Sequence, residues 1–259
     1  MIPQSYITEW RNKAPWQNDA QVEQDFIISE ALIRLYQNEL IQKSLAFRGG
    51  TALNKLFFKS SIRYSDDIDL VQINSAPFGE LFDEIRTTLN YLGKPQSKSS
   101  SHNNALVYKI ESESGQMIKL KIEVNTREHF AILGYNNVTF NINTSWLSTK
   151  AIVTTYCIEE LLATKLRALY QRKKGRDLFD LWYALENITF DIEKVITVWK
   201  KYMKFENNTV TKNDFIKNVE DKMASPLFVN DMNVLIIPTL KYDTNIAMKL
   251  VLEKIINKI

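Results

Sequence analysis

The sequence predicts an α+β protein in two parts. Residues 1–155 are expected to form a mixed sheet with flanking helices, and residues 156–259 a mostly helical part. Two observations predict this division. Strand-like alternation of apolar and polar residues, as over 117–125, gives way near Thr155 to apolar residues at helical spacing. No low-complexity linker separates the two parts, so this change of periodicity is the predicted boundary.

Composition favours a soluble globular protein of one large domain or two moderate ones. Hydrophobic residues make up 45% and charged residues 24% of the 259 residues. The net charge of +3 is too small to indicate a nucleic-acid partner by itself. The single cysteine, Cys157, excludes an internal disulfide, and with only His102 and His129 beside it no structural zinc site is expected. The first residues do not resemble a signal peptide, and no apolar run is long enough to cross a bilayer. A cytoplasmic protein with no membrane partner is therefore expected.

The N-terminal region is predicted to form one long helix over residues 17–42, because its apolar residues recur at helical spacing. Asn18 or Asp19 could cap this helix. Glu23 and Asp25 are interpreted as solvated charges on it.

A double glycine and a hydroxyl residue come next, at Gly49, Gly50 and Thr51. The glycines allow backbone angles and close approaches that a β-carbon forbids. Thr51 is predicted to cap the next helical segment. Free backbone N–H groups at such a helix start suit a phosphate. An isolated Gly-Gly is more commonly just a turn, so a functional interpretation depends on the residues that follow it.

Two carboxylates then come two residues apart. Asp67 and Asp69 project from one face of a predicted strand, while Asp66, Ile68 and Leu70 project from the other. Adjacent carboxylates repel each other, and a divalent cation relieves that repulsion. Mg²⁺ prefers a few carboxylates together with substrate phosphates. An isolated Asp-x-Asp is commonly a solvated strand end, but a preceding phosphate cradle favours metal-dependent nucleotide chemistry.

The remaining elements are predicted from periodicity and from helix-breaking residues. They are a helix over 78–92 stopped by Gly93, a polar loop over 97–101, and strands over 105–112, 117–125, 138–142 and 151–155. Helices are then predicted over 157–172, 177–185, 192–205, 213–223 and 245–259, with Gly175 forming the turn after the first of them.

Glu123 is a possible third carboxylate. If the strand over 117–125 lies beside the Asp67 strand, Asp67, Asp69 and Glu123 share one open face. The alternative is an edge-strand charge that pairs with a nearby cation such as Arg127. The sequence leaves both interpretations open.

Lys165 falls inside the apolar arc of its predicted helix, and Arg172 falls in the same arc. A lysine on a buried face is costly unless it is paired. It could extend toward solvent, but an anion explains it better. Asp177 could cap the next helix or share a partner with Asp180, one turn later. Lys165, Arg172 and Arg176 are the candidate partners. Since a buried charge is costly, a Lys165→Met variant is expected to fold at least as stably as the wild type.

Together these motifs resemble the signature of the AbiEii/AbiGii-type nucleotidyltransferase toxins, within the DNA polymerase β nucleotidyltransferase superfamily. The resemblance extends from the N-terminal helix to about Leu185. The matching residues are Gly49-Gly50-Thr51, Arg63-Tyr64-Ser65-Asp66-Asp67-Ile68-Asp69, Lys165, and Arg176-Asp177-Leu178-Phe179-Asp180.

The resemblance implies transfer of an NMP from an NTP to an acceptor, with Mg²⁺ or Mn²⁺ as cofactor. It makes residues 1–155 the nucleotidyltransferase domain and residues 156–259 a helical domain that closes the active-site cleft. Glu123 departs from the family pattern, in which aspartate is frequent at this position. The implied metal ligands are Asp67, Asp69 and Glu123. The implied catalytic residues are these three together with Lys165 and Asp177. The implied nucleotide-binding residues are Gly49, Gly50, Thr51, Lys165, Arg172, Arg176 and Asp180.

The resemblance also implies the toxin of a toxin–antitoxin or phage-defence pair, opposed by a separately encoded antitoxin. Because some relatives add nucleotides to tRNA ends, tRNA is the favoured acceptor, with other RNA as a further possibility. One alternative is a nucleotidyltransferase that modifies a hydroxyl side chain of a protein. Another is a nucleotide-binding regulatory module without turnover, against which the intact Asp67 and Asp69 argue.

Overall fold

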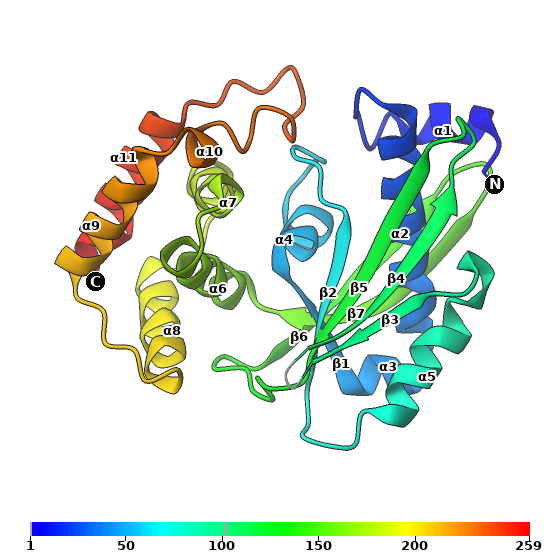
Figure 1. Cartoon of the computed structure of the whole chain (residues 1–259), viewed down its shortest axis with the longest axis horizontal. Coiled ribbons are helices and arrows are strands. Elements are labelled where there is room, and N and C mark those ends of the chain that lie inside the picture. Colours follow the sequence, from blue (N-terminus) through cyan, green and yellow to red (C-terminus); the bar gives the residue numbers. More distant parts are fainter. Residues whose placement is uncertain (1, 101–102) are drawn as a thin grey trace. The chain divides into compact units, whose positions relative to one another are not determined.

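The computed structural model describes residues 2–100 and 103–259 (Figure 1). The described residues form two compact units, divided between Tyr156 and Cys157. Unit 1 is the part up to Tyr156 and unit 2 is the part from Cys157 onward. Together they have the α+β architecture that the sequence predicts, a mixed sheet with flanking helices followed by C-terminal helices. Within the described residues, no helix has the length and apolar character needed to span a membrane.

Unit 1 is built on a seven-stranded sheet with the order β3-β4-β5-β2-β1-β7-β6. The β2–β5 and β1–β7 pairs are parallel and the other neighbouring pairs are antiparallel. The strands are β1 (Leu45–Arg48), β2 (Asp67–Gln72), β3 (Gln96–Ser99), β4 (Asn103–Glu111), β5 (Met117–Asn125), β6 (Tyr135–Asn143) and β7 (Ser148–Tyr156).

Strand β3 overlaps the predicted polar loop, so that prediction is wrong for residues 97–99; residue 101 of the predicted loop lies outside the described residues. All four residues of β3 are exposed, and β3 pairs with β4 at the edge of the sheet. An exposed edge strand buries neither face, so it shows no apolar alternation.

The predicted helix over 17–42 is broken at Asn38 into α2 (Asp19–Gln37) and α3 (Glu39–Ser44). Asn18 caps α2 by accepting a hydrogen bond from the backbone N–H of Ala20 at 2.8 Å. Asn38 caps α3 in the same way through the N–H of Ile41 at 3.1 Å. The long helix α2 packs on β7 and β5 (Figure 1).

Glu23 and Asp25 are not solvated, which corrects the sequence interpretation: they are 2% and 1% exposed. Asp25 accepts hydrogen bonds from Trp10 Nε1 at 2.9 Å and from Lys55 Nζ at 2.6 Å. Glu23 accepts one from the backbone N–H of Glu113 at 2.9 Å, and burial raises its pKa. These partners are distant in sequence, so helical periodicity could not reveal them.

The other helical segments of unit 1 are short. The predicted helix over 78–92 forms α5 and a 3₁₀ turn, and it ends at Gly93 with φ of 88°. These segments are α1 (Gln4–Trp10), α4 (Gly49–Ala52), the π-helical turn η1 (Leu53–Phe57), α5 (Gly79–Thr88) and the 3₁₀ turn η2 (Asn90–Leu92).

Unit 2 is helical, as the periodicity predicts. Helix α6 packs on α7 and α8, and α7 packs on α11. The last predicted helix is shorter than expected, because α11 ends at Lys254. The elements are α6 (Ile158–Gln171), α7 (Gly175–Asn187), α8 (Ile192–Phe205), α9 (Lys212–Met223), α10 (Pro226–Val229), α11 (Thr244–Lys254) and the 3₁₀ turn η3 (Ile256–Lys258).

Gly175 has a different role from the predicted turn. It is the first residue of α7, and a β-carbon added there would lie 2.4 Å from the backbone oxygen of Phe228. Glycine is therefore needed for the close packing of α10 against the start of α7.

Candidate active site

The first candidate cluster lies on β2. Ile68 and Leu70 are buried, whereas Asp67 and Asp69 are half-buried on the opposite face. This is the alternation that the sequence predicts. Both carboxylates therefore lie side by side on a face that is not part of the core.

Strand β5 lies parallel to β2, so the condition for a shared face of Asp67, Asp69 and Glu123 is met. The register places Glu123 opposite Asp69 and Lys121 opposite Asp67. Lys121 forms an ion pair with Glu123. Burial lowers the pKa of Lys121, but the neighbouring carboxylates of Glu123, Asp67 and Asp69 raise it more, so the net shift is upward. Lys121, rather than Arg127, is thus the cation that meets Glu123.

Of the three carboxylates implied as metal ligands, two are placed to hold a divalent metal together. Among residues 2–100 and 103–259, no group of three or more His, Cys, Asp or Glu is placed to hold a metal ion. The carboxylate of Glu123 contacts Lys121, so the implied three-carboxylate site is not assembled in this conformation. Asp67 and Asp69 alone still fit Mg²⁺, which is commonly bound by one or two carboxylates with water and phosphate oxygens.

Gly49 brings the backbone against this carboxylate pair. Its φ is 81°, and a β-carbon added there would lie 2.5 Å from Asp69 Oδ2. Gly49 follows β1, where Arg48 is paired with Asp69 across the sheet. The close approach expected from the double glycine is therefore present, and its neighbour is a carboxylate.

Thr51 does not cap the following helix, contrary to the sequence prediction. It lies inside α4, where Arg48 occupies the N-cap position. Its hydroxyl donates to the backbone oxygen of Asp67 at 2.6 Å and lies 2.7 Å from Ser65 Oγ. Thr51 thus holds the start of β2 in place beside α4.

Arg48, which is half-buried, and the buried Glu128 form an ion pair that the sequence motifs do not reveal. Arg48 Nη1 lies 2.6 Å from Glu128 Oε2. Burial lowers the pKa of Arg48, but Glu128, Tyr156 and Asp69 together raise it more, so the net shift is upward. The only signal in the sequence is the position of Arg48 directly before the glycines.

Gly49→Ala is expected to destabilise the protein and impair activity, because it adds a clash with Asp69 to the strain of a positive φ. Gly93→Ala is the matched control: its φ is 88°, and an added β-carbon meets nothing within 4 Å. Thermal melts and activity assays should show a larger loss for Gly49→Ala by about 1–3 kcal/mol. Equal losses would mean that the contact with Asp69 has no consequence.

The second candidate cluster lies in unit 2, between α6 and α7. Lys165 Nζ is 2.8 Å from Asp180 Oδ2 and 3.2 Å from Asp177 Oδ1. Arg172 adds two hydrogen bonds to Asp177, from Nε at 2.6 Å and from Nη2 at 2.8 Å. Both carboxylates are fully buried and Lys165 is 5% exposed. The pairing predicted for Lys165 and Arg172 is present.

Asp177 is not the cap of α7. The N-cap position is Lys174, without a side-chain cap hydrogen bond, and Asp177 lies inside the first turn. Arg176 is held through its backbone N–H, which donates to Asp231 Oδ2 at 3.1 Å. No sequence pattern had indicated Asp231.

Acidification is expected to weaken unit 2 through Asp177. Burial raises the pKa of Asp177, but Lys165 and Arg172 lower it more, so the net shift is downward. The folded protein therefore binds a proton less readily than the unfolded chain. The stabilisation is complete above the unfolded pKa of about 4 and is lost as pH falls through the lower folded pKa.

Urea unfolding between pH 7 and pH 3 measures this effect. The Asp177→Asn variant has no carboxyl to titrate there, so its free energy of unfolding should fall less steeply in the acid range. Identical slopes in the variant and the wild type would show that other groups cause the acid sensitivity.

Lys222 is another buried group that sequence reasoning missed. Its ammonium donates to the backbone oxygen of Leu169. It also donates to the backbone oxygen of Tyr170 and to Asn218 Oδ1, each at 2.6 Å. Burial lowers its pKa to about 8. Lys222 from α9 thus accounts for orphan carbonyl groups at the end of α6.

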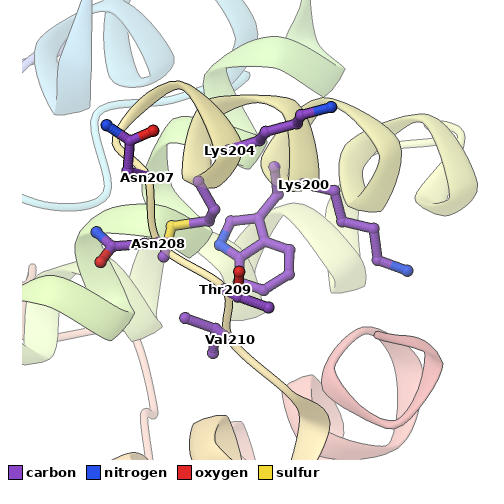
Figure 2. Close-up of a pocket in the computed structure, with 8 residues that line it drawn as sticks. Lys200, Lys204, Asn207, Asn208, Thr209 and Val210 are labelled. Atoms are coloured by element: carbon purple, nitrogen blue, oxygen red, sulfur yellow. The ribbon is translucent and has the colours of Figure 1, made fainter.

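Unit 2 also has a cavity of about 530 Å³ beside the end of α8. Trp199 is one of the residues that line it. Figure 2 shows that the side chains of Lys200 and Lys204 extend away from Thr209 and Val210 in different directions. A ligand site needs polar groups that converge. The cavity is therefore assigned no role.

Comparison with known proteins shows which family this sequence matches. The family model described as "Nucleotidyl transferase AbiEii toxin, Type IV TA system" matches residues 31–250. None of the curated proteins matches the chain in sequence.

Two solved structures resemble the chain. One is MenT4, a nucleotidyltransferase toxin from Mycobacterium tuberculosis H37Rv, with a TM-score of 0.65 and 17% identity over 100% of this chain and 91% of that chain. The other is a protein from H. pylori described as a candidate nucleotidyltransferase, with a TM-score of 0.55 and 15% identity over 93% of this chain and 96% of that chain. At these identities the likeness shows the fold.

Proposed function

Because the chain belongs to the AbiEii family of nucleotidyltransferase toxins of type IV toxin–antitoxin systems, we propose that it transfers an NMP from an NTP to an RNA acceptor, with tRNA favoured. One observation carries the proposal. Asp67 and Asp69 lie side by side on the open face of β2, with the backbone of Gly49 against Asp69. Two carboxylates that could bind a metal ion therefore lie beside a backbone segment that can approach a phosphate.

In this proposal Asp67 and Asp69 hold Mg²⁺ or Mn²⁺. The ion, when bound, would neutralise the negative charge that develops on the phosphate during transfer. Gly49 and Gly50 present backbone to the triphosphate, where side chains would block it. Thr51 fixes the backbone of Asp67 by its 2.6 Å hydrogen bond.

Glu123 has two possible roles in the reaction. It completes the set of metal ligands, or it accepts the proton of the acceptor hydroxyl. Either role requires its carboxylate to exchange the contact with Lys121 for a new one. Lys121 would then remain as a cation opposite Asp67.

We assign the Lys165 cluster of unit 2 to the same reaction. Lys165, Arg172 and Arg176 supply positive charge for the triphosphate, and the two buried carboxylates hold Lys165 in position. The support is the match of Lys165 and the Arg-Asp-x-x-Asp run to the family pattern, together with the tendency of buried, coupled charged groups to gather at functional sites.

The deciding experiment incubates the protein with each labelled NTP, Mg²⁺, and either total RNA or total protein. Label in RNA supports the proposal, and loss of label with EDTA supports the metal. Label in protein instead would favour a protein-modifying nucleotidyltransferase. Nucleotide binding without any transfer would favour a regulatory module.

The family also implies an antitoxin as partner. We propose that a separately encoded antitoxin restrains the enzyme in the cytoplasm and that the pair contributes to phage defence. Growth arrest on expression of the chain, relieved by a co-expressed antitoxin, tests the first part. Phage plaque counts with and without the pair test the second.

A further inference from the structure

Unit 1 contains a cavity of about 320 Å³ that has no part in the site described above. Its walls come from four segments: the end of α1 and the residues after it, Ser29 of α2, the π-helical turn η1 with the loop after it, and β6. π-helical turns within helices occur frequently at functional sites. The cavity is near the lower end of the size range of small-molecule sites.

The charges at this cavity are all positive. Lys13, Lys55 and Lys59 line it, and its described lining includes no carboxylate. Lys13 Nζ and Lys55 Nζ lie 5.1 Å and 5.9 Å from the centre of the Trp10 ring, which also lines the cavity. Asp25 neutralises Lys55 at 2.6 Å, whereas Lys13 and Lys59 are exposed. The balance favours an anionic ligand.

Asn54 is among the residues that line this cavity. Its side-chain amide nitrogen donates to the backbone oxygen of Arg63 at 2.9 Å, which fixes the orientation of the amide. Asn54 is 4% exposed, and its Oδ1 has no hydrogen-bond partner within the described residues. A buried acceptor without a donor is unfavourable. A ligand that brings an N–H donor to Oδ1 would remove that cost.

Aromatic rings complete the lining. Phe140 on β6 is half-buried and Phe58 is buried. Aromatic rings next to lysines are the combination on which unpaired bases stack while phosphates are neutralised. A nucleotide unites an anion, a flat apolar ring and N–H donors, and so matches all three features.

We propose that this cavity binds one nucleotide, with its phosphate against Lys13 and Lys59 and its base toward Phe140 and Asn54. The nucleotide is either free or one unit of a single-stranded RNA. This binding needs neither NTP turnover nor the carboxylates of β2, so it stands or falls separately from the proposed function.

Fluorescence anisotropy with a labelled RNA hexamer of adenines and cytosines tests the proposal, in EDTA and without NTP. Lys59→Glu should weaken binding by about tenfold or more through charge reversal. Phe140→Leu should weaken it by about fivefold or more, because the stacking surface is lost. The matched control is Lys109→Glu, an exposed lysine of β4 outside the cavity. It should change binding by less than about twofold, since distant surface charges are screened. Thermal melts verify folding.

Competition identifies the source of the nucleotide. Displacement of the hexamer by AMP, lost in Lys59→Glu, supports a free nucleotide, and resistance to AMP supports RNA. Equal displacement by inorganic phosphate would overturn the proposal, as would absence of binding of both the hexamer and labelled AMP, or equal effects of Lys59→Glu and Lys109→Glu. Asp69→Asn is measured in parallel. Binding that depends on Asp69 and not on Lys59 would place the nucleotide at the transfer site and refute this cavity.

Discussion

Asp67→Asn and Asp69→Asn are each expected to abolish nucleotidyl transfer while the fold survives. Both side chains lie on the open face of β2, opposite the buried Ile68 and Leu70, so neither substitution alters the core. Removing one charge weakens metal binding and the stabilisation of phosphate charge in the transition state. The loss should reach at least about 10²–10³-fold in turnover.

Asp66→Asn is the matched control for these variants. Asp66 is the exposed residue just before β2, and the strand alternation puts it on the other face from Asp67. It should retain turnover within a few-fold of the wild type. Circular dichroism and thermal melts establish that all three variants fold. Activity of Asp67→Asn or Asp69→Asn close to that of Asp66→Asn would remove these carboxylates from the metal site.

The sequence predicted the part of the site that depends on strand periodicity. Because side chains alternate along a strand, the shared face of Asp67 and Asp69 followed from their spacing. The adjacency of β5 entered only as a condition, which the structure meets, and the register places Glu123 opposite Asp69. These inferences use local rules that tertiary packing left unchanged.

The contacts that the sequence could not predict come from side chains meeting across elements. Thr51 fitted the rule for a helix cap, but its hydroxyl meets the backbone of Asp67 on β2. Asp25 fitted the rule for a solvated helix charge, but it is enclosed by Trp10 and Lys55. Lys121 was given no role of its own, and it pairs with Glu123 because both point from one face of β5.

Lys165→Met is expected to lose most of its activity, because the proposed charge stabilisation of the triphosphate disappears. The structure reverses the expectation that this variant folds at least as stably as the wild type. Asp177 and Asp180 are fully buried, and Lys165 contacts both. Removing one partner of a buried ion pair leaves uncompensated charge and costs about 3–5 kcal/mol. Arg172 still pairs with Asp177, so the loss should lie near about 3 kcal/mol.

The double variant Lys165→Met with Asp180→Asn separates stability from chemistry. It removes the carboxylate charge that loses its contact with Lys165 in the single variant, so urea unfolding should show recovery of part of the lost free energy. Turnover, measured at a temperature where all variants are folded, should stay low in both variants if Lys165 acts on the nucleotide. Near-normal turnover in the double variant would make Lys165 a purely structural partner of Asp180. A double variant no more stable than Lys165→Met would instead show that the loss of the Lys165–Asp180 contact is not the cause of the instability.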